Sequence, residues 1–162
     1  VLVEGKCDDK FISRVLAFRY PNAQVSVIPA NSDDRIKEVL AVAKGLFSDL
    51  QKSPYRDRIF VILDAVHSAT LPEQLVRMGL PPENVVRWPK NGIEYYYPPA
   101  IVDQIYGVGD ELPIEADRVS RNGVSYTKAE LVEKVVALMD VDTTMHPDVQ
   151  ERFLKFADEK AG

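Results

Sequence analysis

The sequence predicts an α/β fold: a Rossmann-like, four-stranded parallel sheet with helices on both faces and a C-terminal helical extension. Two observations support this prediction. Strand-like and helix-like segments alternate through residues 1–90, which is typical of parallel strands joined by right-handed helical crossovers. Beyond residue 90 the alternation stops and amphipathic helical segments become the main pattern, which indicates the extension.

Four short apolar segments are the expected strands. They are VLVEG at 1–5, QVSVIPA at 24–30, RIFVILDA at 58–65 and NVVRW at 84–88. The third segment is the most apolar run of the chain, as expected for a central strand that is buried on both faces. Helical periodicity lies between them, at 8–18, after the N-cap sequence NSDD, and at 71–78.

The second part of the chain has a different pattern. Residues 93–107 are typical of a broken helical stretch, and residues 108–123 of an irregular polar loop. Amphipathic periodicity at 127–139 and 146–160 predicts two further helices.

Composition indicates one globular domain. The chain has 162 residues, of which 46% are hydrophobic and 28% charged, and this length is sufficient for a self-contained core. We expect residues 1–95 to form the core of the domain and residues 96–162 to complete it. The chain starts with a strand-like Val1 in place of Met, so we expect it to be a fragment of a longer protein.

The sequence contains no apolar run long enough for a membrane span and no secretory leader, so we expect no membrane partner. Its single cysteine, Cys7, excludes an intramolecular disulfide and predicts a cytoplasmic location. The thiol is either incidental, as is more common, or a ligand or nucleophile. The net charge of −5 gives no global attraction to nucleic acid.

Carboxylates follow two of the expected strands. Glu4 ends the first and Asp64 ends the third, while Asp8 and Asp9 open the helix next to Glu4. The carboxyl ends of parallel strands share one edge of the sheet, where open α/β folds bind ligands. Neighbouring strands lie ~4.8 Å apart, and acids this close raise one another's pKa unless a cation lies between them. The pattern favours Mg²⁺ or Mn²⁺, although Asp64 on its own is equally well explained as a turn cap.

The spacing of these acids resembles that of a known family. VEGKCD is similar to the E-G-x-x-D signature of TOPRIM domains, which occur in topoisomerases, primases and OLD (overcoming-lysogenisation-defect) nucleases, and LDAVH occupies the position of their D-x-D motif. This resemblance covers about residues 1–90. A weaker one links NGIEYYY and SYTKAEL to the extension of OLD-type nucleases.

The resemblance implies roles for five residues. Glu4 would be a metal ligand or general base, and Asp8 and Asp64 would be metal ligands. Glu94 would serve a second metal, and Lys128 would stabilise charge on the scissile phosphate. Two-metal phosphodiester cleavage uses cations ~3.5–4 Å apart, and a lysine adds charge stabilisation.

One position departs from the family pattern. The second acid of D-x-D is Val66 here, and its side chain cannot bind a metal. The site then works with one metal, or Glu94 or His67 compensates, or the domain is catalytically degenerate. A lone histidine in a loop is more often a surface residue than a ligand.

The resemblance therefore leads to two hypotheses. The first is a Mg²⁺- or Mn²⁺-dependent DNA endonuclease of OLD type, coupled to an ATPase on the same or a partner chain, homo-oligomeric at full length and serving phage defence. The second is a degenerate TOPRIM-like module that binds nucleic acid or a protein partner without cleaving it.

Two further features each have two interpretations. Residues 95–97 are three tyrosines that either stack on unpaired bases or, as we favour, pack a helix on the sheet with their hydroxyls in water. Five cations are either a rim that contacts phosphates or scattered surface charge: Lys52, Arg56, Arg58, Arg87 and Lys90.

Overall fold

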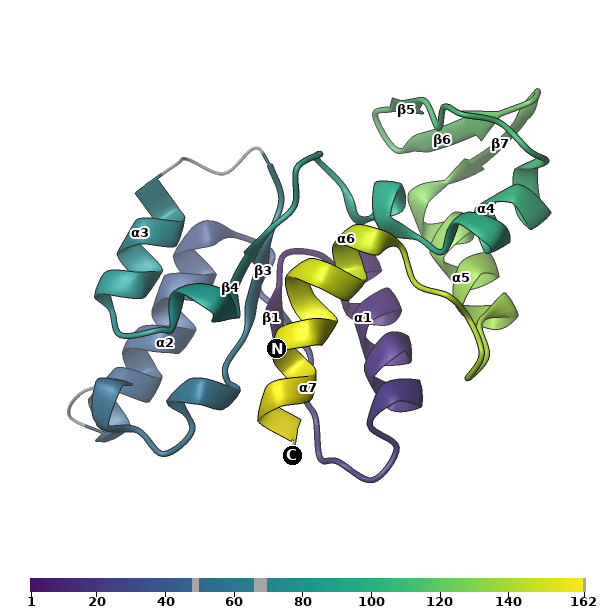
Figure 1. The fold of residues 1–162 in the computed structure, drawn as a ribbon. Coiled ribbons are helices and arrows are strands. Elements are labelled where there is room, and N and C mark those ends of the chain that lie inside the picture. The colour runs from purple at the N-terminus through teal and green to yellow at the C-terminus, as the bar shows by residue number, and fades with distance from the viewer. Residues whose placement is uncertain (48–49, 66–69, 162) are drawn as a thin grey trace.

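A computed structural model describes residues 1–47, 50–65 and 70–161. Its main sheet has four parallel strands in the order β2-β1-β3-β4 (Figure 1). The strands are β1 (Leu2–Val3), β2 (Ile28–Pro29), β3 (Val61–Leu63) and β4 (Val85–Arg87). The expected fold class is confirmed, although every strand is shorter than its apolar segment.

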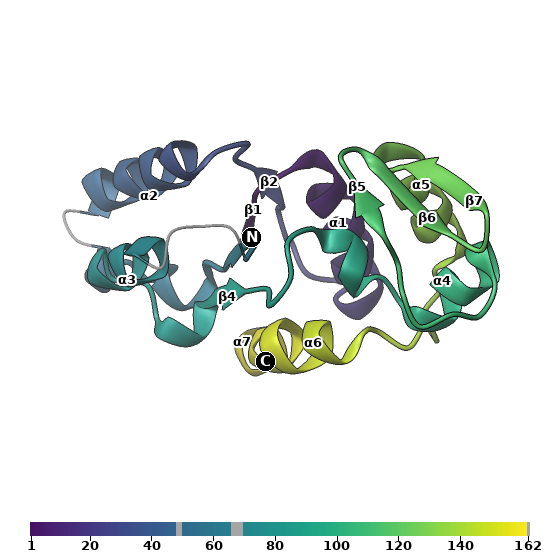
Figure 2. The ribbon, with the colours of Figure 1, turned by 90° about the horizontal axis from the view of Figure 1, so that it is seen from above.

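Helices cover both faces of this sheet. In the two views, α2 and α3 lie on one side, and α1 and the C-terminal helices lie on the other (Figures 1 and 2). The helices are α1 (Lys6–Arg19), α2 (Asp33–Phe47), α3 (Thr70–Arg77), α4 (Pro99–Tyr106), α5 (Lys128–Leu138), α6 (Pro147–Val149) and α7 (Lys155–Ala161). Short turns of 3₁₀-helix are η1 (Leu50–Lys52), η2 (Arg56–Arg58), η3 (Pro82–Asn84) and η4 (Ile93–Tyr96), and a π-helical segment, η5 (Gln150–Leu154), joins α6 to α7.

The alternation of side chains along the strands creates two hydrophobic cores. One core packs the sheet against α1, α4, α5 and the C-terminal helices, and the other packs it against α2 and α3. Val3, Ile62 and Val86 belong to the first core, and Leu2, Val61 and Leu63 belong to the second. The central strand β3 is buried on both faces, as its composition predicts.

The extension is only partly as expected. The two predicted helices are present, but the prediction of an irregular loop at 108–123 is wrong. This region contributes to an antiparallel sheet of β5 (Ile114–Glu115), β6 (Arg118–Arg121) and β7 (Val124–Thr127). The reason is local: Asn122 and Gly123 have φ angles of 52° and 77°, and such an Asn-Gly pair closes a tight hairpin.

Membrane insertion is not indicated by any of these helices. Within the described ranges, none combines the length and the apolar character needed to cross a bilayer.

Candidate functional site

Three acids line one cavity at the carboxyl edge of the main sheet. Glu4 follows β1, Asp64 follows β3, and Asp8 lies in the first turn of α1. All three line one cavity of about 370 Å³, together with Gly5, Asn31 and Ser32. β1 and β3 are neighbours in the sheet, which explains why acids 60 positions apart in the sequence lie together.

Backbone hydrogen bonds hold this edge in place. The Glu4 carboxylate accepts a hydrogen bond from the backbone N–H of Asp64. The Glu4 carbonyl oxygen accepts another from the backbone N–H of Asn31 at 2.7 Å. Residues after β1, β2 and β3 are therefore connected to one another directly through Glu4.

Gly5 determines where the Asp8 carboxylate lies. Its backbone N–H donates to Asp8 Oδ2 at 3.2 Å. A Cβ atom on Gly5 would lie 3.0 Å from that same oxygen, closer than side chains tolerate without a shift. The φ of −123° at Gly5 is open to any residue. Glycine is therefore favoured at this position of the E-G-x-x-D pattern by the space that the Asp8 carboxylate occupies, and not by the backbone conformation.

The pKa of Asp8 is raised by its surroundings. It is only 9% exposed, and burial, followed by the charge of Asp64, raises its pKa from 3.8 to about 7. Glu4 and Glu94 raise it further, against a backbone hydrogen bond that lowers it. A site in which acids oppose one another's ionisation attracts a cation or a proton.

A second part of the site joins the extension to this edge. Glu94 on η4 is 2% exposed, and its Oε2 lies 3.5 Å from Nζ of Lys128, the first residue of α5. Gly92 has a φ of +113°, and a Cβ atom there would collide with Glu94 Oε2. The structure therefore brings together two residues that are 34 positions apart in the sequence.

Electrostatic coupling links the two parts. Glu94 contributes to the raised pKa of Asp8. Cys7 is half-buried, and burial, then Glu94 and Asp8, raise the pKa of its thiol, while Lys128 lowers it. The five predicted residues thus belong to one electrostatic neighbourhood.

The donor types of the cavity fit a hard divalent cation. Glu4, Asp8 and Asp64 supply carboxylate oxygens, the ligands that Mg²⁺ and Mn²⁺ prefer. In the part of the chain that is described, however, no three acid, histidine or cysteine side chains converge into a ready-made metal cage. Val66 and His67, the residues next to Asp64 that complicate the family pattern, lie outside the described residues.

Sequence reasoning missed two residues of the cavity, Asn31 and Ser32. They follow β2, whose carboxyl end lies at the same edge, so the rule that identified Glu4 and Asp64 could have found them. Asn31 has a positive φ of 63°, a conformation that asparagine adopts more readily than most residues.

The three tyrosines at 95–97 differ in how far they are buried. Tyr96 and Tyr97 are 2% and 1% exposed, so the packing interpretation is confirmed for both. The Tyr97 hydroxyl, however, is buried and not in water. The Tyr96 hydroxyl accepts from the Lys90 backbone N–H at 2.5 Å. Tyr95 is only half-buried.

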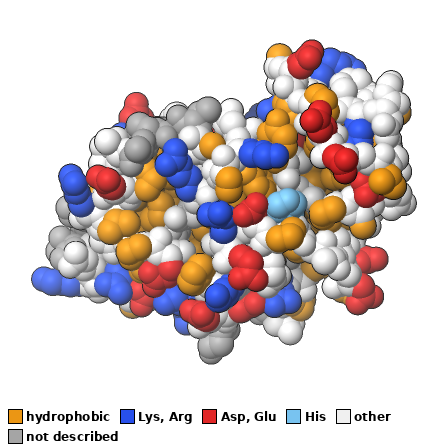
Figure 3. Space-filling model, turned by 45° about the horizontal axis from the view of Figure 1, so that its top comes forward, with side chains coloured by type: hydrophobic (Ala, Val, Ile, Leu, Met, Phe, Trp, Pro, Cys, Tyr) orange, Lys and Arg blue, Asp and Glu red, His pale blue; other side chains and the backbone are white. Residues whose placement is uncertain are grey.

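The five cations do not form one rim. Those on η1 and η2 precede β3, at the opposite edge of the sheet. Arg87 donates to the carbonyl of Ala65, next to Asp64, at 2.9 Å, and Lys90 lines the same cavity as Glu94. Figure 3 shows cationic and acidic side chains interspersed over the visible face.

Comparison of the chain with protein-family models, with curated proteins and with solved structures gave no match.

Proposed function

We propose that this domain is a Mg²⁺- or Mn²⁺-dependent nuclease of TOPRIM type that hydrolyses phosphodiester bonds in DNA. The observation that carries the proposal is the shared cavity of Glu4, Asp8 and Asp64 at the carboxyl edge of a parallel sheet. The adjoining pair of Glu94 and Lys128 supports it, because a lysine next to a cation site suits an anionic substrate.

Each residue has a distinct task in this proposal. Glu4, Asp8 and Asp64 would hold the cation, which supplies Lewis-acid activation of water and of the phosphate when bound. Lys128 Nζ stabilises negative charge on the phosphate. Glu94 orients this ammonium group in the metal-free state, and a second cation would bind at Glu94, as the resemblance implies. A cation that binds at Asp8 displaces the proton that this carboxyl, with its pKa of about 7 in the metal-free state, holds near neutral pH.

The other expectations are part of the same proposal. The nuclease would be cytoplasmic, homo-oligomeric at full length and coupled to an ATPase in cis or in trans, with a role in phage defence. The second candidate remains the degenerate module, and it is favoured by Val66 at the position of the second D-x-D acid.

Two measurements on the chain test the proposal. Isothermal titration with Mn²⁺ should show binding that Glu4→Gln and Asp64→Asn abolish. Asp34→Asn is a matched control, because the Asp34 side chain is 90% exposed on α2, and it should bind as wild type does. A supercoiled plasmid should then be nicked by wild type with Mn²⁺ and not by the two site variants.

The outcomes separate the candidates. Metal binding with no cleavage supports the degenerate module. Unchanged Mn²⁺ binding by both site variants would show that the cation site is elsewhere.

A further inference from the structure

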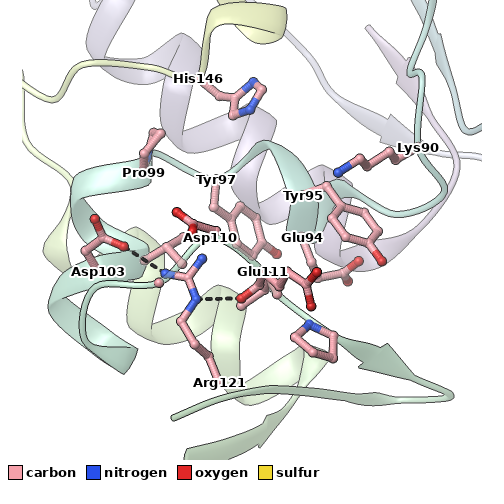
Figure 4. A pocket seen from close by; sticks show the side chains of 14 residues that line it. Lys90, Glu94, Tyr95, Tyr97, Pro99, Asp103, Asp110, Glu111, Arg121 and His146 are labelled. Atoms are coloured by element: carbon pink, nitrogen blue, oxygen red, sulfur yellow. Dashed lines mark hydrogen bonds and ion pairs between the residues drawn. The ribbon is translucent and has the colours of Figure 1, made fainter.

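A second and larger cavity adjoins the acidic site. Its volume is about 660 Å³, within the ~300–1,000 Å³ typical of small-molecule sites. Its walls come from η4, α4, the segment before β5, strand β6 and the residue that precedes α6 (Figure 4). Figure 4 shows His146 and Arg121 on opposite sides of the lining residues, with Tyr97 between them.

Glu94 connects this cavity to the candidate metal site. It lines the cavity, and its carboxylate is the one that pairs with Lys128 Nζ at 3.5 Å. A strand whose phosphate lies at Lys128 therefore has a neighbouring nucleotide within reach of the cavity.

Two groups in the cavity are neutral hydrogen-bond donors. His146 Nδ1 accepts from the backbone N–H of Asp148 at 3.1 Å, and burial lowers the pKa of the ring. The neutral imidazole therefore carries its proton on Nε2. The Tyr97 hydroxyl is buried without a hydrogen-bond partner among the described residues, and burial, followed by the charge of Glu94, raises its pKa well above the usual value.

The half-buried ring of Tyr95 offers an aromatic surface. Lys90 Nζ lies 5.0 Å from the centre of that ring, and Lys90 forms no ion pair within the described ranges. Stacking of a nucleobase on a tyrosine stabilises more than an exposed ammonium over the same ring does. A base would therefore displace the ammonium, which is then free to approach a phosphate.

The charges of the cavity favour a base over a phosphate. Arg121 is neutralised by Asp103 at 2.7 Å, and its Nε donates to the Glu111 carbonyl at 2.8 Å. Asp110 and Glu111 are exposed acids on the lining. Carboxylates repel phosphate, but they accept hydrogen bonds from the amino groups of bases.

We propose that this cavity receives one unpaired nucleobase of the strand whose phosphate lies at Lys128. This inference rests on the proposed nuclease function and defines its substrate class as single-stranded or locally unpaired DNA. Tyr95 stacks on the base, His146 Nε2 and the Tyr97 hydroxyl donate to its acceptor atoms, and Lys90 contacts the adjoining phosphate.

Fluorescence anisotropy in EDTA tests the inference without any cleavage. The probe is a labelled single strand of about 12 nucleotides of mixed sequence, compared with the same strand in a duplex. We expect the single strand to bind about tenfold more tightly than the duplex, and Tyr95→Leu to lose about tenfold of that affinity. Tyr55→Leu is the matched control, because Tyr55 is an exposed tyrosine ahead of η2, at the other edge of the sheet.

A second pair of variants isolates the donor at His146. His146→Leu should weaken strand binding, whereas His146→Gln, which keeps an N–H donor, should retain most of it. Melting temperatures of all variants confirm that each is folded. Lys90→Gln, a change at an exposed side chain, provides a further variant that should weaken binding without affecting the core.

Several results would overturn the inference. These are equal affinity for single strand and duplex, equal binding by Tyr95→Leu and Tyr55→Leu, or no binding of the strand at all. Tighter binding of free ATP than of the strand would assign the cavity to a free nucleotide instead. Because the assay contains no metal, failure of the nuclease assay alone leaves this inference standing, and its own failure leaves the nuclease proposal standing.

Discussion

Replacing Asp8 with asparagine should stabilise the metal-free protein at neutral and alkaline pH. The pKa of this carboxyl is raised, chiefly by burial and then by Asp64. The folded state therefore binds the Asp8 proton more tightly than the unfolded state does. The resulting destabilisation is absent below pH 3.8, grows between pH 3.8 and about 7, and is complete above that.

The size of the effect follows from the displacement of the pKa. A change from 3.8 to about 7, at ~1.4 kcal/mol for each pKa unit, sets a ceiling of about 4 kcal/mol. Asparagine keeps an oxygen for the Gly5 N–H, which donates to Asp8 at 3.2 Å, but a neutral acceptor forms a weaker bond than a carboxylate does. We therefore expect Asp8→Asn to raise the free energy of unfolding by about 2 kcal/mol at neutral and alkaline pH.

Urea denaturation in EDTA at about pH 8 and about pH 4 measures this gain. The variant should be more stable than wild type at the higher pH and equal to it at the lower. Asp9→Asn is the control: it removes the same charge from the first turn of α1, where Asp9 accepts from the Ser13 hydroxyl at 3.0 Å, and it should not stabilise. Equal or lower stability of Asp8→Asn at pH 8 would refute the view that burial and the neighbouring acids destabilise the ionised Asp8 carboxylate.

Two more substitutions test the geometry of the site. Gly5→Ala should weaken Mn²⁺ binding about tenfold in isothermal titration, because the new Cβ displaces the Asp8 carboxylate; Gly45→Ala, where a Cβ meets nothing within 4 Å, should bind normally, and equal binding by both would exclude Asp8 as a ligand. Lys128→Met should lower the free energy of unfolding by about 3 kcal/mol, since it leaves the buried Glu94 carboxylate uncompensated. Combining Lys128→Met with Glu94→Gln should recover most of the lost stability. A Lys128→Met variant as stable as wild type would mean that the pair is not ionic.

The main sheet and the acids at its edge could be predicted from the sequence because both depend on local rules. Buried strands read as apolar runs, and residues after parallel strands meet at one edge. The same rules applied to β2 would also have predicted Asn31. Strand lengths could not be predicted, since an apolar run such as 24–30 continues beyond the two residues of β2 that pair.

The antiparallel sheet was missed for a different reason. Polar residues are frequent in 108–123 and indicate a loop. The Asn122-Gly123 pair between the two strands is the local signal from which the hairpin could have been predicted. The contact of Glu94 with Lys128 depends on how η4 and α5 pack against each other. Nothing local to either segment encodes that distance, so only the family resemblance suggested the pair.

In the proposed enzyme, attraction of DNA must come from specific contacts, because the chain has a net charge of −5. Without a cation, the acids at Glu4, Asp8 and Asp64 repel a phosphate, and Lys128 is paired with Glu94. Binding of Mg²⁺ or Mn²⁺ would reverse the local charge and remove the ionisation penalty at Asp8 in the same step. Stacking of a base on Tyr95 would contribute affinity that does not depend on charge. Strand binding should therefore persist in EDTA but strengthen with the cation, whereas a site that binds only phosphate would lose the strand entirely when the cation is removed.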